Sequence, residues 1–221
     1  MYLTQFSVNV GRRAAREMLV SPERTHAAVL GCFPPGQHRT DEARTLWRLD
    51  RRSSHDIVLL ISSPLRPDLT ALNEECGWST GTSGKTADYA GFLAALEIGQ
   101  RWAFRLAANP VHAVADPARP GARGRRVAHV TASQQLAWLL HRSERHGFSL
   151  GEAAEPTVAV TRREMLSFKR KGKTVTVSRA QFDGVLEVTD ADSLKTAIHQ
   201  GIGPAKGYGL GMLTLARPHK V

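Results

Sequence analysis

Hydrophobic and polar residues alternate over residues 2–10, where Tyr2, Phe6 and Val8 share one face. A period of two predicts a half-buried strand. Further along the first half, periodicity and turn residues predict a helix from Pro22 that ends before Pro34, two strands over residues 44–62, a helix carrying Leu65, Leu69 and Leu72, and a strand over residues 88–99. A stretch rich in Gly, Ser and Thr before that last strand predicts a mobile loop.

The second half shows the same succession of patterns. Alternating residues from Arg101 to Leu106 predict a strand, and Thr131 with Gln134 forms a capping-box pattern at the start of a helix that Gly147 closes. The remaining elements are two strands over residues 157–169 and 173–188, a helix capped by Asp190 or Asp192, and a last strand within residues 211–216.

This order, strand-helix-strand-strand-helix-strand in each half, predicts the α+β class. It favours two tandem ferredoxin-like (βαββαβ) domains, one over residues 1–97 and one over residues 98–221. A chain of 221 residues is long enough for two small domains. The halves share this plan without sharing detectable sequence similarity.

The charge balance indicates a polyanionic partner. Thirty Lys and Arg residues stand against twenty Asp and Glu residues, a formal net charge of +10. Nucleic acid is the commonest partner of such a chain, and an anionic membrane surface is the alternative. A basic protein without such a partner is the third reading.

Other features argue against several classes of protein. No apolar run approaches the length of a membrane-spanning helix, and the N-terminus lacks the pattern of a signal peptide, so a cytoplasmic location is expected. Cys32 and Cys76 form no CxxC pair, and the nine histidines show no metal-binding spacing. We therefore expect no metal site and no small-molecule cofactor.

The most unusual segment is the glycine-rich stretch of residues 201–213, which contains Gly203, Lys206 and Gly207. Glycines allow a backbone to approach a ligand closely, and successive N–H groups can bind phosphate oxygens next to a lysine. The segment is not a P-loop, because neither Ser nor Thr follows the lysine and a strand follows the loop. A tight turn between helix and strand is an equally good reading.

Basic residues gather at two further places. The predicted hairpin carries Arg162 and Arg163 on one strand and Lys169, Arg170, Lys171 and Lys173 at its tip. A basic hairpin can enter a groove of folded RNA, although a solvated turn explains such a tip equally well. Arg123, Arg125 and Arg126 lie in an insertion rich in Pro and Gly, which we expect to become ordered on binding.

His26 is the candidate for acid–base chemistry, in the second turn of the first predicted helix. RNA cleavage without a metal needs a base for the 2′-OH proton and an acid for the leaving 5′-oxygen, and an imidazole suits either role. Glu23 lies three residues earlier on the same helix face, where it could raise the pKa of His26 or act as a base. The simpler readings are that His26 has no catalytic role and that Glu23 complements the helix dipole.

These motifs together resemble the CRISPR repeat-RNA endoribonucleases of the type I-E system, the CasE subunit of the Cascade complex. The similarity runs over nearly the whole chain and is most specific in QGIGPAK and GLGML within residues 200–213. It implies binding of the repeat stem-loop and cleavage at the 3′ base of the stem. The products would carry a 2′,3′-cyclic phosphate and a 5′-OH, and the enzyme would stay bound to the mature crRNA together with other Cascade subunits. The resemblance places His26 at the catalytic position.

One position departs from this family, which often has a tyrosine where this chain has Glu23. Glu23 could take over that role, or Lys206, Tyr2 or Tyr208 could contribute. The departure keeps a second hypothesis open, namely a catalytically inactive RNA-binding subunit of the same kind of complex. A structural protein whose basic surface contacts other subunits is the weaker third hypothesis.

Overall fold

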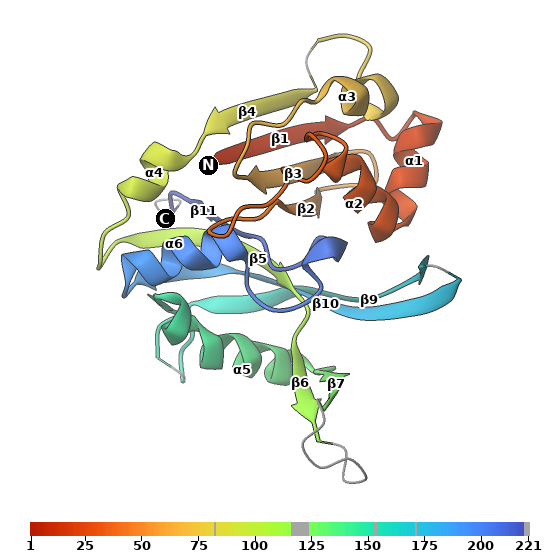
Figure 1. Ribbon diagram of the computed structural model, residues 1–221. Coiled ribbons are helices and arrows are strands. Elements are labelled where there is room, and N and C mark those ends of the chain that lie inside the picture. Colours follow the sequence, from red (N-terminus) through yellow and green to blue (C-terminus); the bar gives the residue numbers. More distant parts are fainter. Residues whose placement is uncertain (82, 116–123, 153, 171, 219–221) are drawn as a thin grey trace.

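The computed structural model describes residues 1–81, 83–115, 124–152, 154–170 and 172–218 (Figure 1). The first half contains β1 (Tyr2–Val8), α1 (Arg13–Val20), α2 (Pro22–Leu30), β2 (Leu46–Arg51), β3 (Ile57–Ser63), α3 (Thr70–Cys76), β4 (Gly84–Asp88) and α4 (Ala90–Ala94). Its four strands form an antiparallel sheet in the order β2-β3-β1-β4. Strand β1 is central because Phe6 and Val8 are buried on one face, as the alternation of its residues predicts.

The second half contains β5 (Arg101–Ala108), β6 (Val111–Val114), β7 (Arg125–Ala128), α5 (Ala132–Ser143), the 3-10 turn η1 (Glu144–His146), β8 (Phe148–Ser149), β9 (Val158–Arg170), β10 (Lys173–Val188), α6 (Ala191–Gln200), the 3-10 turn η2 (Lys206–Tyr208) and β11 (Leu213–Ala216). Strands β11, β5 and β10 are neighbours in that order, and both β8 and β9 pair with β10. Strands β6 and β7 form a separate hairpin. The two antiparallel sheets with their helices confirm a mixed α and β fold.

Most predicted elements are present, and two predictions were wrong. The strand expected over residues 88–99 is instead β4, which ends at Asp88 and is followed by helix α4. Helix α1 was not predicted, and the helix expected from Leu65 starts at Thr70. Most of the arginine-rich insertion, residues 116–123, lies outside the described residues, and Arg125 and Arg126 belong to strand β7.

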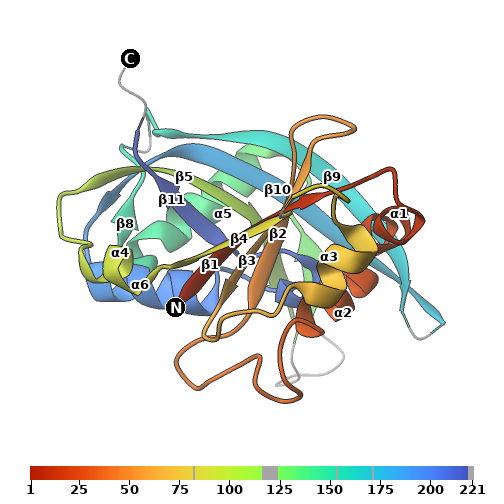
Figure 2. The same cartoon turned by 90° about the horizontal axis from the view of Figure 1, so that it is seen from above.

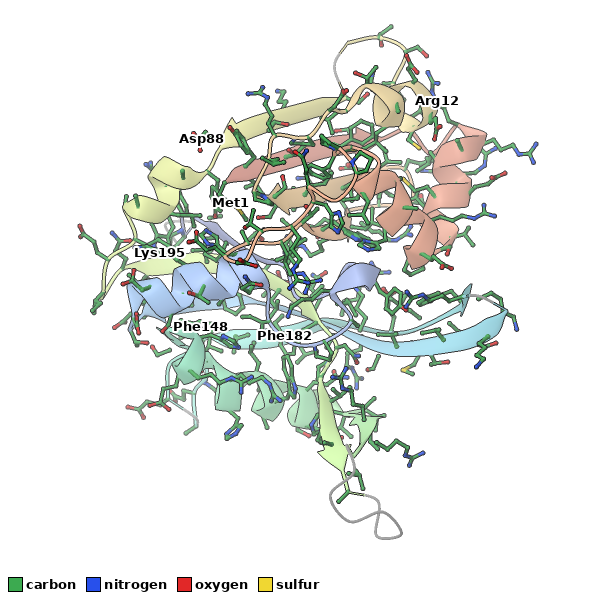
Figure 3. The ribbon with its side chains drawn as sticks, in the orientation of Figure 1. Met1, Arg12, Asp88, Phe148, Phe182 and Lys195 are labelled. Atoms are coloured by element: carbon green, nitrogen blue, oxygen red, sulfur yellow. The ribbon has the colours of Figure 1, made fainter. Side chains whose placement is uncertain are left out.

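The two sheets face each other, and helices pack on their opposite faces. Helices α5 and α6 cover the second sheet around Phe148 and Phe182, which Figure 3 labels, and Trp138 of α5 stacks on Phe182. Between the sheets, the fully buried Arg48 donates two hydrogen bonds to Asp50 and others to the carbonyls of Arg105 and Met212. A buried arginine needs all these partners, so this network fixes the packing of the two halves.

The long hairpin of β9 and β10 extends the second sheet beneath the first half of the chain. Seen from above, it extends to the side of the molecule that carries α1 and α2 (Figure 2). Within it, Arg179 donates to the carbonyl of Leu49 and pairs with Glu164. The end of β9 is thereby brought beside helix α2, although about 140 residues separate them in the sequence.

Candidate active site

A cleft of about 880 Å³ lies where the two halves meet. Its walls come from helix α2, the residue Arg44 before β2, hairpin β6–β7, the end of α5 with η1, the last residue of β9, and the glycine-rich segment around η2. Residues from six separate parts of the chain therefore converge on one space.

His26, on helix α2, is half-buried in the wall of this cleft. The indole Nε1–H of Trp47 donates to Nδ1 of His26 at 3.2 Å. Because an indole nitrogen can only donate, Nδ1 must be the acceptor, so the neutral ring carries its proton on Nε2. That Nε2 faces Gly207, where a Cβ atom would lie 3.5 Å away. Trp47 thus fixes which nitrogen of His26 holds the proton.

The electrostatic surroundings of His26 favour its neutral form. Burial lowers the pKa of His26, and the positive charges of His38, Arg170 and Arg44 lower it further. Glu23 is not among the causes of this shift. The expectation that Glu23 raises the pKa of His26 was therefore wrong for the protein without RNA, because the carboxylate points to a different partner.

That partner is Arg170, the last residue of β9. Its Nε lies 3.8 Å from Oε1 of Glu23, and its Nη1 donates a 2.5 Å hydrogen bond to the hydroxyl of Tyr208. The guanidinium also lies over the Tyr208 ring, 5.6 Å from its centroid. The Glu23–Arg170 contact is long and partly exposed, so an anionic ligand can replace it at little cost.

The cleft is lined by many cations. Arg44, Arg126, Arg142, Arg145, Arg170 and Lys206 all contribute, and among the described residues Glu23 is the one carboxylate on the lining. Burial lowers the pKa of Lys206, and the charge of Arg44 lowers it further. The Nε atom of Arg44 is buried without a hydrogen-bond partner in the described part of the chain. Like charges held together in this way favour an anionic ligand that neutralises them.

The glycine-rich segment fits tightly against the histidine wall. Gly209 has φ +76°, and a Cβ there would come within 2.4 Å of the Trp47 ring. Ala205 is left-handed at φ +66° although it is not glycine. A side chain at Gly209 would overlap the Trp47 ring, which explains why this position is glycine.

The structure brings together part of the predicted site. Glu23, His26, Arg126, Arg170, Gly203, Lys206 and Gly207 line the cleft. The other described members do not: Arg162 pairs with Glu164, Arg163 donates to the carbonyl of Val130, Lys169 donates to Thr174, and Arg125 and Lys173 are exposed. Arg123 and Lys171 lie outside the described residues.

Sequence reasoning missed several residues of the cleft. Arg142 and Arg145 lie at the end of α5 and in η1, where basic residues are equally explained by the helix dipole. His112 reaches the cleft from β6, which was not predicted as a strand. Arg44 carried no signal, since it precedes β2 and its position depends on contacts between the two halves.

The described residues contain no group of three or more His, Cys, Asp or Glu side chains arranged to hold a metal ion. None of the helices in the described ranges has the length and apolar character needed to span a membrane. Neither observation bears on the reaction itself.

Comparison with known proteins places the chain in a family. A family model described as "CRISPR associated protein" matches residues 1–217. The chain is 34% identical to the CRISPR-associated endoribonuclease Cse3 of Thermus thermophilus, over 98% of this chain and all of that protein. It is 30% identical to the CRISPR system Cascade subunit CasE of Escherichia coli, over 98% of this chain and 99% of that protein.

A solved structure of Thermus thermophilus Cse3, bound to an RNA that represents a pre-cleavage complex, is similar throughout. The TM-score is 0.81 at 32% identity, and the match covers 97% of this chain and 98% of that one. The cleft thus belongs to a CRISPR-associated protein. Within this class the chain is a member of the type I-E CasE and Cse3 family, as the resemblance of its motifs predicted.

Proposed function

We propose that this protein is a metal-independent endoribonuclease that binds the stem-loop of CRISPR repeat RNA, cuts at the 3′ base of the stem and retains the mature crRNA within a Cascade complex. The observation that carries the proposal is the cationic cleft that surrounds a histidine with its proton fixed on Nε2. The names of its relatives, an endoribonuclease and a Cascade subunit, support the same substrate class.

We further propose that the halves are tandem ferredoxin-like domains, divided near residue 98. The two halves have the same strand order, which supports this division into domains. Each half, counted by its four main strands, places the fourth, first, third and second strands side by side. The cleft then lies between two domains, a common position for ligand sites.

In the proposed reaction, the 2′-oxygen attacks the adjacent phosphorus and the bond to the 5′-oxygen breaks, leaving a 2′,3′-cyclic phosphate and a 5′-OH. Arg170 exchanges Glu23 for the phosphate, which frees the Glu23 carboxylate to accept the 2′-OH proton. His26 is protonated once the phosphate lies beside it, and its Nε2 gives a proton to the 5′-oxygen. The remaining cations of the cleft hold neighbouring phosphates.

The test is cleavage of an end-labelled repeat hairpin from the organism's own CRISPR array, in excess EDTA, by the wild type and by His26→Ala. We expect one cut by the wild type, with a cyclic phosphate at the new 3′ end. The variant should bind the hairpin normally without cutting it. A wild-type rate that disappears in EDTA would contradict the metal-independent mechanism.

An inactive RNA-binding subunit is the second candidate function, because Glu23 stands where the family often has a tyrosine. Glu23→Gln separates the two. If Glu23 is the base, this variant should lose cleavage by about 10²–10⁴-fold. Tight hairpin binding without cleavage by the wild type would establish the inactive subunit instead.

A further inference from the structure

The cleft holds a tyrosine whose hydroxyl has capacity left to bind a ligand. Tyr208 lines the same space as His26, and it directly follows Gly207, the residue that faces Nε2 of His26. Its hydroxyl accepts a hydrogen bond from Nη1 of Arg170 at 2.5 Å. A phenol can accept one bond and still donate its own proton. Within the described ranges, the structure gives that proton no acceptor.

The Tyr208 side chain is held in place from two directions. Its ring packs edge-on against the buried Phe168, with centroids 4.8 Å apart, and Arg170 covers the ring and binds the hydroxyl. Its backbone lies in η2, between left-handed Ala205 and left-handed Gly209. A group fixed in this way loses little entropy when it binds a ligand, as a preorganised donor should.

The charges around Tyr208 indicate which kind of ligand its hydroxyl can bind. Arg170 leaves its own long contact with Glu23 readily, and the surrounding lining is cationic. A guanidinium and a hydroxyl that are already bonded to each other can bind two oxygens of one tetrahedral anion. In the cleavage reaction, negative charge grows on the non-bridging oxygens of the phosphate as the 2′-oxygen attacks.

Resting on the proposed function, we propose that Tyr208 is a further catalytic residue, whose hydroxyl donates a hydrogen bond to a non-bridging oxygen of the scissile phosphate while it accepts one from Arg170. Tyr208 keeps its proton throughout. The proton of the 2′-OH and the proton received by the 5′-oxygen still pass through Glu23 and His26. Tyr208 thus stabilises charge in the transition state and transfers nothing.

The test is Tyr208→Phe, which keeps the ring on Phe168 and removes the hydroxyl. Single-turnover cleavage of the repeat hairpin should slow by about 10- to 10²-fold, as for loss of one donor to a developing oxyanion. Affinity for a hairpin with a 2′-deoxy residue at the cut should change by less than about twofold, because the bond strengthens mainly in the transition state. Tyr89→Phe is the matched control, since Tyr89 precedes α4 outside the cleft, and this variant should cleave at the wild-type rate.

A sulfur substitution separates a direct contact from a structural role. Replacing one non-bridging oxygen of the scissile phosphate by sulfur should slow the wild type for one stereoisomer, and this slowing should be smaller in Tyr208→Phe. Wild-type cleavage with an undiminished Tyr208→Phe rate would overturn the inference alone. So would a rate loss matched by an equal loss of affinity, or an unchanged sulfur effect. A wild type that does not cleave would overturn the proposed function and this inference with it.

Discussion

The two walls of the cleft differ in how their side chains are held. On the wall formed by α2 and the glycine-rich segment, His26 is fixed by Trp47, and Tyr208 is fixed by Phe168 and Arg170. On the wall formed by β6–β7 and the end of α5, Arg126 and Arg145 are exposed and form no ion pair among the described residues. The first wall is suited to chemistry, which needs exact placement, and the second to holding phosphates, which needs charge.

This difference predicts that rate and affinity can be changed separately. The largest effect belongs to His26. His26→Ala should slow cleavage by about 10²–10⁴-fold and leave the Kd for the hairpin nearly unchanged, because it removes the proton donor while the arginines and Lys206 of the cleft still hold the phosphates. A substrate with sulfur in place of the leaving 5′-oxygen needs no acid, so it should be cleaved by the variant almost as fast as by the wild type.

His26→Gln is the matched variant, since it retains a polar side chain in the same wall. If the sulfur substrate fails to rescue either variant, His26 does not act as the acid. If the wild type and both variants cleave the sulfur substrate at the same rate, His26 is the acid.

Substitutions on the wall formed by β6–β7 and the end of α5 should instead change the affinity for RNA and leave the cleavage rate unchanged. Arg126→Ala combined with Arg145→Ala should weaken hairpin binding by about 10- to 100-fold, because two charge-assisted contacts to phosphate are lost. The slope of log Kd against log salt should become shallower by about 1.4 to 1.8. The rate constant of the fully bound complex should hardly change.

The control for lost charge is Arg66→Ala combined with Arg101→Ala, two exposed arginines outside the cleft. If this control weakens binding as much as the first pair, the effect comes from net charge and the second wall has no special role.

A smaller effect tests how the first wall is held. Trp47→Phe removes the donor to Nδ1, which stabilises the neutral form of His26, so the pKa of His26 should rise. For a histidine that acts as an acid, the cleavage rate falls as pH rises through this pKa. The falling limb of the pH–rate profile should therefore move to higher pH by about 0.7 unit, the equivalent of a hydrogen bond of about 1 kcal/mol.

Trp102→Phe provides the comparison, because its indole donates to Gln100 away from the cleft. A limb that rises with pH through the pKa of His26, and that moves to higher pH in Trp47→Phe, would instead identify His26 as the base.

Local patterns in the sequence revealed much of this first wall and little of the second. His26, Lys206 and Gly207 stand in motifs with recognisable spacing, and the capping box at Thr131 formed as predicted. Arg44 and His112 could not be found in this way, because their positions depend on how the two halves pack. Helix α1 was missed because its arginines, Arg13 and Arg16, obscure a short apolar face of Ala15 and Met18.

The smallest effect concerns the tip of the β9–β10 hairpin, where sequence reasoning placed a cluster of RNA-binding residues. The structure separates these residues: Arg170 lines the cleft, whereas the exposed Lys169 and Lys173 do not. Replacing both lysines by alanine should weaken hairpin binding by less than about threefold at physiological salt, because exposed charges away from the ligand are screened. Arg170→Ala should slow cleavage far more. A loss of affinity from the lysine pair as large as that from Arg126 and Arg145 would show that RNA extends from the cleft along the hairpin.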